Sequence, residues 1–276
     1  FDSSNPIEGR RRGDTPRSPI GTAQSPSPTG KAKLTLCCYR KCSLAEGKFK
    51  MIPLKDTIPS ERYPIITILL IVVNVSLFFY EISLGQYLPE FVKLAGVVPA
   101  RFFDSRLYVS QPAAERYFPI FTSLFLHGGW FHLVTNMLYL WVFADNIEDR
   151  LGHFRFPIFY LLCGFGASLA HIFANPTSSV PSIGAIAGVL GAYFILYPKS
   201  RVITLVPVFF FLQIVEIPAF IFLGIWFVMQ FLNGVLTLGL GTAQTGGVAW
   251  WAHIGGFLSG IVFILLLKGK KHQRRY

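Results

Sequence analysis

Charge is scarce in this sequence. Asp, Glu, Lys and Arg make up only 14% of the 276 residues, whereas 52% are hydrophobic. Of the charged residues the acidic ones are fewer, with 14 Asp and Glu against 25 Lys and Arg. The mean hydropathy is +0.49, which is too high for a chain that must cover its surface with solvated side chains. The composition therefore excludes an ordinary soluble globular protein and indicates a polytopic membrane protein.

Metal-binding patterns are also missing. Cys37, Cys38 and Cys42 lie close together, but no downstream set of Cys and His completes a zinc site. The fourth cysteine, Cys163, lies in an apolar run and is expected to be a small packing residue. There is no His-Glu-x-x-His motif and no carboxylate close to the central histidines. We therefore expect neither a metal nor another cofactor.

The net charge of +11 does not indicate a nucleic-acid partner. The basic residues gather in the N-terminal segment, in short loops between apolar runs and in the tail KGKKHQRRY, as membrane orientation requires. No basic face interleaved with aromatic residues is present outside the apolar runs. A transporter is also disfavoured because the apolar runs show no internal repeat. The expected surroundings are a lipid bilayer and other membrane proteins.

Residues 1–50 form a separate segment. The stretch Phe1–Lys33 is rich in Ser, Pro, Gly and Arg and nearly free of large apolar residues, so we expect it to be disordered. Its Arg-rich, acid-poor character is compatible with an organelle transit segment. A translated upstream stretch that is not native to the protein is the favoured alternative, because the first methionine is Met51.

Six apolar runs follow, which predict an all-α, six-helix transmembrane bundle. The segment Gly85–Leu126 mixes apolar and basic residues and is expected to lie in the membrane interface. The run Val202–Val215 contains Pro207 and is expected to be a bent, half-immersed connection. The six runs are Ile65–Leu84, Phe131–Ile147, Phe156–Ala174, Ile183–Tyr197, Ile217–Leu238 and Val248–Leu267.

The loop charges predict the orientation of the bundle. Basic residues flank the runs on one side, whereas NPTSSVPS and GTAQTGG on the other side contain no Lys or Arg. We therefore expect a multi-pass protein of the bacterial cytoplasmic membrane with both termini cytoplasmic. Its parts would be a juxtamembrane segment at 51–64, a transmembrane domain at 65–267 and a basic cytoplasmic tail at 268–276.

Small residues predict a close contact between the fourth and sixth runs. Glycines recur at helical spacing on both, which allows two helices to approach to backbone contact. The fourth run is also too short to cross alone, because its fifteen residues give about 22 Å of helix against roughly 30 Å of hydrocarbon. Its start should therefore lie below the membrane surface, beside a wet cavity. The glycines are Gly184, Gly188 and Gly191 on the fourth run, and Gly256 and Gly260 on the sixth.

Three polar residues are expected to meet at that sunken helix start. His132 and Asn136 are four residues apart and share one face of the second run, and His253 lies on the glycine face of the sixth. Each one alone is equally compatible with a structural hydrogen bond to a neighbouring helix. Together they favour a site in which His253 is a general base, next to two hydrogen-bond donors and the unpaired N–H groups of a helix start.

The order of the motifs HGGWFHLVTNMLYLWVFADNIEDRLG and AHIGGFLSG, with a small-residue helix between them, resembles the rhomboid intramembrane serine proteases. The resemblance covers about residues 51–267. It implies that His253 is the catalytic base and that His132 and Asn136 stabilise the oxyanion. It also implies that the substrates are transmembrane segments of other membrane proteins.

The sequence departs from this family at the nucleophile. The family has a Gly-x-Ser-Gly motif at the start of the fourth helix, but here the aligned residues are Pro181, Ser182, Ile183 and Gly184, so isoleucine occupies the serine position. One helical residue shifts a side chain by about 100° and 1.5 Å, which places the adjacent Ser182 poorly as a substitute. We therefore expect a pseudoprotease that binds membrane helices. The alternative is an active serine endopeptidase in which Ser182 works with His253.

Overall fold

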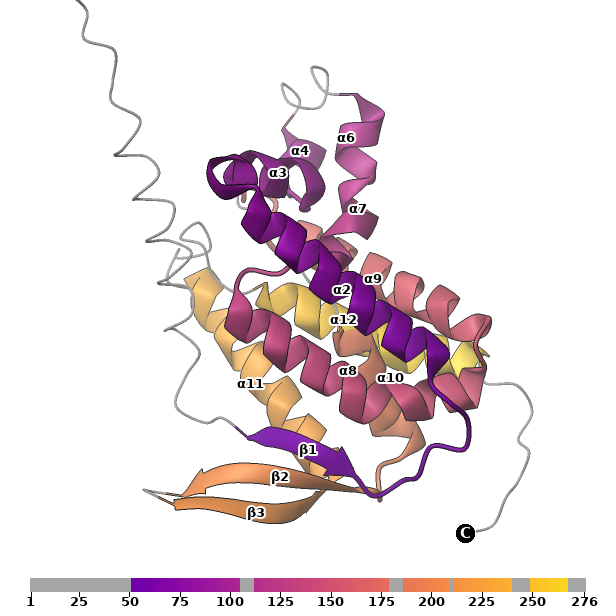
Figure 1. Cartoon of the computed structure of the whole chain (residues 1–276). Helices are drawn as coiled ribbons and strands as arrows, with labels where there is room; N and C mark the ends of the chain where they lie inside the picture. Colours follow the sequence, from indigo (N-terminus) through magenta and orange to yellow (C-terminus); the bar gives the residue numbers. More distant parts are fainter. Residues whose placement is uncertain (1–50, 105–111, 179–185, 209–210, 240–248, 268–276) are drawn as a thin grey trace, which may run out of the picture.

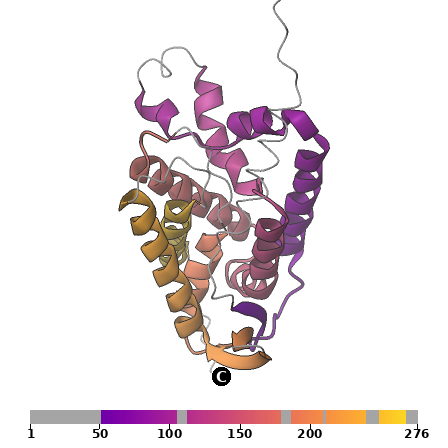
Figure 2. The ribbon, with the colours of Figure 1, turned by 90° about the vertical axis from the view of Figure 1, so that its left-hand side faces the viewer.

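The computed structural model describes residues 51–104, 112–178, 186–208, 211–239 and 249–267. Within these ranges the chain is mostly helical, as expected from the sequence. Its longer helices form a bundle with a small β-sheet at one end and several short helices at the other (Figure 1 and Figure 2). The longer helices are α2 (Ile65–Ser83), α8 (Trp130–Leu151), α9 (Arg155–Ala174), α10 (Ala187–Leu196), α11 (Ala219–Gly239) and α12 (Trp250–Leu267).

Each of these helices overlaps one of the six apolar runs. Four of them, namely α2, α9, α11 and α12, are long and apolar enough to cross a membrane. The C-terminal end of α8 carries charged residues, and the ten residues of α10 give only about 15 Å of helix. The described residues therefore support a multi-pass membrane protein, whereas the count of six spans stays a prediction.

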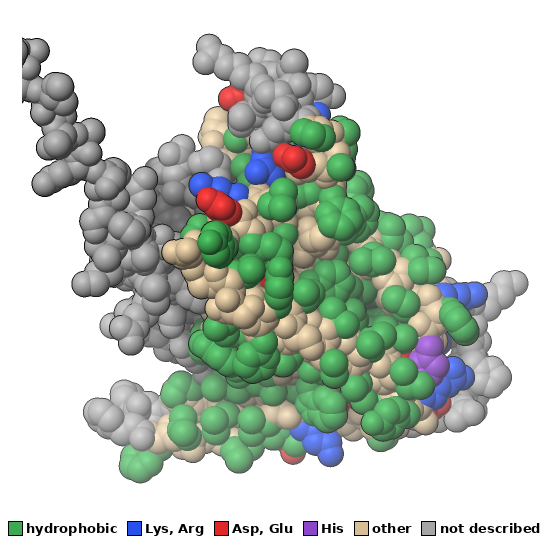
Figure 3. Space-filling model, turned by 45° about the horizontal axis from the view of Figure 1, so that its top comes forward, with side chains coloured by type: hydrophobic (Ala, Val, Ile, Leu, Met, Phe, Trp, Pro, Cys, Tyr) green, Lys and Arg blue, Asp and Glu red, His purple; other side chains and the backbone are tan. Residues whose placement is uncertain are grey.

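The outer surface of the bundle is apolar. Large hydrophobic side chains such as Leu69, Val72, Val228 and Leu232 are exposed along α2 and α11. Figure 3 shows such side chains over most of one face, with charged groups toward its periphery. Exposed apolar surface of this extent is unfavourable in water and favourable against lipid tails. The surface therefore agrees with the composition in indicating a membrane protein.

The segment between α2 and α8 contains no single long helix. Short helical pieces follow one another and gather at the end of the bundle away from the sheet (Figure 1). Prolines at helix starts divide the segment, because proline fits the first turn of a helix and not its interior. The pieces are η2 (Gly85–Tyr87), α3 (Leu88–Ala95), α4 (Ala100–Phe103), α6 (Ala113–Tyr117), α7 (Pro119–Thr122) and η3 (Ser123–Phe125). Their place in the membrane interface stays a prediction.

A three-stranded antiparallel sheet corrects two of our expectations. The apolar run at 202–215 is not a bent connection but a hairpin of β2 (Arg201–Val208) and β3 (Phe211–Pro218). The juxtamembrane segment contributes β1 (Ile52–Asp56), which pairs with β2, so the fold is not purely helical. The β-branched residues of β2 suit a strand, and Pro207 is tolerated near the end of the hairpin.

A buried carboxylate fastens the sheet to the bundle. Asp56, at the end of β1, is only 6% exposed. Its Oδ2 accepts a hydrogen bond from the Asn146 side-chain amide of α8 at 2.8 Å and another from the Tyr193 hydroxyl of α10. Since β3 leads directly into α11, this one carboxylate connects β1 with two helices of the bundle and, through the sheet, with a third.

The same end of α8 holds the start of α2. The first N–H groups of a helix lack partners within it, and Pro64, which precedes α2, supplies no side-chain cap. Glu148 of α8 supplies the missing acceptors: its oxygens accept from the N–H groups of Ile66 and Thr67 at 2.9 and 2.8 Å and from the Thr67 hydroxyl at 2.7 Å. Glu148 is 1% exposed, so this is a buried link between two helices.

Candidate functional site

Helices α10 and α12 touch through their glycines. A Cβ atom placed on Gly260 would overlap the backbone carbonyl of Gly188, and one placed on Gly191 would overlap the carbonyl of Phe257. A Cβ on Gly256 would lie 3.5 Å from the Gly188 backbone nitrogen. No larger residue fits at Gly191 or Gly260 without moving a backbone, so glycine sets the distance between the two helices. The predicted Gly184 lies outside the described residues.

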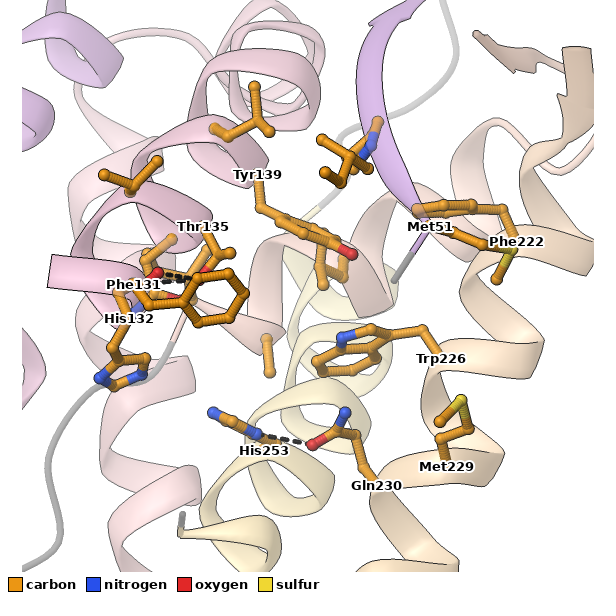
Figure 4. A pocket seen from close by; sticks show the side chains of 18 of the residues that line it. Met51, Phe131, His132, Thr135, Tyr139, Phe222, Trp226, Met229, Gln230 and His253 are labelled. Atoms are coloured by element: carbon orange, nitrogen blue, oxygen red, sulfur yellow. Dashed lines mark hydrogen bonds between the residues drawn. The ribbon is translucent and has the colours of Figure 1, made fainter. Parts of the chain in front are cut away.

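The three predicted polar residues line one groove. It encloses about 280 Å³ between α8, α11 and α12, and its walls are mostly apolar and aromatic. His132 and Asn136 contribute from α8 and His253 from α12, while Met51 and Phe222 lie at the far end (Figure 4). The groove also reaches Ile186 and Ala187 at the start of α10. The fold thus gathers side chains that lie more than 100 positions apart in the sequence.

His132 presents a hydrogen-bond donor that lacks a protein partner in the described part of the chain. Its Nδ1 accepts the backbone N–H of Gly128 at 3.3 Å. A neutral imidazole that accepts at Nδ1 carries its proton on Nε2. That Nε2 atom is buried without a hydrogen-bond partner among the described residues. Because an unpaired buried donor is costly, it suits a group that receives its acceptor from a bound molecule.

His253 is held from a different helix. Its Nδ1 lies 2.8 Å from Oε1 of Gln230 on α11. The rings of Trp226 and Trp250 surround it, with centroids 5.8 and 6.4 Å from its own. The histidine is half-buried and lines the groove, so its ring is both packed and accessible to a molecule in the groove.

Sequence reasoning missed Gln230. A signal was available, because Gln230 is one of two amide side chains, with Asn233, within the apolar run of α11, and polar side chains in such runs are expensive and frequently functional. Its partner could not be predicted, since it lies 23 positions further along the chain.

The predicted nucleophile region cannot be placed. Pro181, Ser182, Ile183 and Gly184 all lie outside the described residues. No group of three or more His, Cys, Asp or Glu side chains that could hold a metal ion is found in the described residues. The arrangement that can be described is one histidine held at Nδ1, a second that presents Nε2, and an amide at Asn136, all beside an apolar groove.

The chain is similar to known proteins of one family. The family model described as a rhomboid domain matches residues 114–270, more than half of the chain. RHOMBOID-like protein 6, mitochondrial, from Arabidopsis thaliana is 30% identical over 152 residues, covering 54% of this chain and 44% of that protein. Rhomboid protein 1, mitochondrial, from Saccharomyces cerevisiae is 27% identical over 186 residues, covering 63% and 50%.

A bacterial protein matches over a shorter stretch. Rhomboid protease GluP from Bacillus subtilis is 34% identical over 89 residues, which cover 32% of this chain and 18% of that protein. The matched stretch spans half or less of the length of each of these three relatives. The family match nevertheless contains the glycine-packed helices and every histidine of the groove, and on this evidence the chain belongs to the rhomboid family of membrane proteins.

Proposed function

We propose that this protein binds transmembrane segments of other membrane proteins in the groove between α8 and α11. The observation that carries the proposal is the groove itself, which combines apolar walls with His132, Asn136 and His253. Apolar walls accept the side chains of a membrane helix. The Nε2–H of His132 and the side-chain amide of Asn136 can donate to backbone carbonyls that such a segment exposes when it unwinds, which lipid cannot do.

We further propose that the chain as written binds without cleaving, and thus acts as a pseudoprotease. In the aligned motif Ile183 occupies the serine position, and an isoleucine side chain cannot form an acyl-enzyme. Without the covalent step, the remaining donors can only polarise the carbonyl of a bound segment.

A second candidate is an active intramembrane serine endopeptidase. It is favoured by the retained donors, because a hydrolytic site needs His253 held in place and donors such as His132 Nε2 aimed at an oxyanion. In this reaction the Ser182 oxygen attacks the peptide carbonyl while its proton passes to His253 Nε2. The C–N bond then breaks, the leaving amine takes that proton, and water releases the acyl group.

The orientation in the membrane is part of the proposal. We place both termini on the side of the basic loops and the 175–182 connection on the other side. The bacterial cytoplasmic membrane is the proposed location, although relatives named mitochondrial also match. Labelling of Thr177→Cys, an exposed position, from the side opposite the basic loops tests this orientation. Labelling only from the basic-loop side would refute it.

Photocrosslinking tests binding directly. A photoreactive amino acid at Val134, an exposed residue of α8 in the groove wall, should crosslink to a single-pass membrane protein, and excess unlabelled transmembrane segment should abolish the product. The matched control is Val72, which is equally apolar and exposed on α2 and does not line the groove. Equal crosslinking from both positions would mean random collision in the lipid and would contradict the proposal.

A further inference from the structure

Gln230 is a buried amide in an apolar helix. It is 8% exposed, and α11 is otherwise built almost entirely of hydrophobic residues. An amide removed from water destabilises the fold unless it is hydrogen-bonded. Its contact with His253 supplies such a bond, and it joins α11 to α12 at the groove (Figure 4).

We propose that Gln230 is the positioning residue of His253. The amide oxygen accepts the proton on Nδ1, which leaves the lone pair on Nε2 as the base. This is the role that a carboxylate has in a Ser-His-Asp triad, where it fixes the tautomer and the ring orientation. Here a neutral amide performs it. The inference rests on the proposed function only in taking His253 as the base of the site.

The two groove histidines are therefore held in opposite tautomers. The Gly128 N–H donates to Nδ1 of His132 and leaves its proton on Nε2. Gln230 Oε1 accepts at Nδ1 of His253 and leaves Nε2 unprotonated. One ring then offers a donor to the groove and the other an acceptor, which is the division that base catalysis beside an oxyanion site requires.

Because Gln230 lies on α11, its contact with His253 has a second consequence. His132 and Asn136 belong to α8 and His253 to α12, and α11 forms a further wall of the groove. Any displacement of α11 that breaks the 2.8 Å contact also releases the tautomer of His253. The base is thus in its correct form only while α11 is packed against α12.

Nitrogen-15 NMR of histidine in the full chain tests the inference without requiring any activity. The His253 signals are assigned by their loss in His253→Asn. In the native chain, Nδ1 of His253 should have a protonated-type shift and Nε2 an unprotonated-type shift. Gln230→Leu, which keeps a similar volume, should shift the proton toward Nε2, whereas Gln230→Glu keeps an acceptor and should preserve the Nδ1 proton.

Thr237→Val is the matched control for these variants. Its hydroxyl bonds the Gly234 carbonyl on the same helix and does not line the groove, so the His253 shifts should stay as in the native chain. A native spectrum with the proton on Nε2 would mean that the amide is turned and donates to the ring, and it would overturn the proposal. Unchanged shifts in Gln230→Leu would overturn it as well.

A kinetic readout separates positioning from mere packing. In the chain with Ala-Ser-Gly inserted after Gly184, Gln230→Leu should lower kcat about tenfold with little change in KM. Gln230→Glu should keep most of the parent chain's kcat, because it retains an acceptor for Nδ1. Equal loss in both variants would indicate a packing role only and contradict the proposal. Failure of Val134 to crosslink would instead refute the proposed function, while the NMR result would still stand.

Discussion

The hydroxyl of Tyr193 on α10 donates a hydrogen bond to the carboxylate of Asp56 on β1, 137 positions earlier in the chain. This bond fastens the strand to the helix that follows the predicted nucleophile region in the sequence. The same carboxylate accepts from Asn146 of α8, the helix of His132 and Asn136. The sheet is therefore fixed to α8, which contributes His132 and Asn136 to the groove, and to α10, which reaches the groove with Ala187 and Leu190.

The first prediction concerns this anchor. Asp56→Ala leaves the buried Tyr193 hydroxyl without this acceptor, while the Asn146 amide keeps only the Asp145 carboxylate at 3.1 Å. We expect a loss of about 1–3 kcal/mol of stability, the penalty for one unsatisfied buried group. Chemical or thermal unfolding in detergent measures it. The control is Lys55→Ala, an exposed neighbour on β1 that should unfold as the native chain does. Equal stability of the two variants would contradict the anchoring role.

The second prediction is a pH dependence. Burial raises the pKa of Asp56 above its ordinary value of 3.8. The folded chain therefore holds this proton more tightly than the unfolded chain does. The resulting stabilisation is complete below pH 3.8 and is lost as the pH rises through the raised pKa.

The comparison with Asp56→Asn isolates that effect, because asparagine keeps an acceptor but does not titrate. The native chain should lose stability relative to this variant as the pH increases over that window. Unfolding curves at several pH values measure the difference. A stability difference between the two chains that is constant with pH, or that changes in the opposite direction, would show that burial does not raise the pKa of Asp56.

The third prediction concerns Glu148. Replacement by alanine leaves the N–H groups of Ile66 and Thr67 and the Thr67 hydroxyl unpaired inside the protein, so we expect a loss of at least about 3 kcal/mol. Glu216→Ala removes an exposed carboxylate paired with Arg201 at 3.1 Å and should change stability by less than about 0.5 kcal/mol. Unfolding midpoints of the two variants compare them, and similar midpoints would disprove the role of Glu148 in holding α2.

The fourth prediction concerns the glycine contact. Gly260→Ala forces α12 away from the Gly188 carbonyl and should cost about 1–3 kcal/mol, as overpacking does elsewhere. Gly224→Ala on α11 is the matched control, since its Cβ would have its nearest neighbour at 4.0 Å. Because alanine favours helix, the control should be neutral or slightly stabilising. Thermal unfolding of both variants decides the matter, and an unaffected Gly260→Ala would argue against close packing.

Much of the helical framework could be predicted from the sequence, because most of each long helix lies within an apolar run, although the C-terminal end of α8 is charged. The predicted run Ile65–Leu84 matches α2 to within one residue at each end. Its start is well defined because Pro64, which is disfavoured inside a helix, directly precedes it. The sheet could not be predicted in the same way. The pairing of Ile52 with Leu205 joins residues 153 positions apart, and no local pattern reveals such a partner.

The site shows the same division. His132, Asn136 and His253 stand out as polar residues in apolar runs. The order of the motifs that contain them resembles the rhomboid proteases, and this resemblance predicted their roles. Gln230 is also a polar residue in such a run, but its role depends on the rotation of α11 against α12, which only the packed structure provides. The predicted Ser182 and Ile183 lie outside the described residues, so their roles stay predictions.

Cleavage of a single-pass membrane reporter by the full chain tests the central claim most directly. The chain as written should bind the reporter without cutting it, and Ser182→Ala should change nothing, because Ile183 occupies the serine position. Insertion of Ala-Ser-Gly after Gly184 should create cleavage that His253→Ala abolishes. Cleavage by the chain as written that disappears in Ser182→Ala would contradict the account and establish the protein as an active serine endopeptidase.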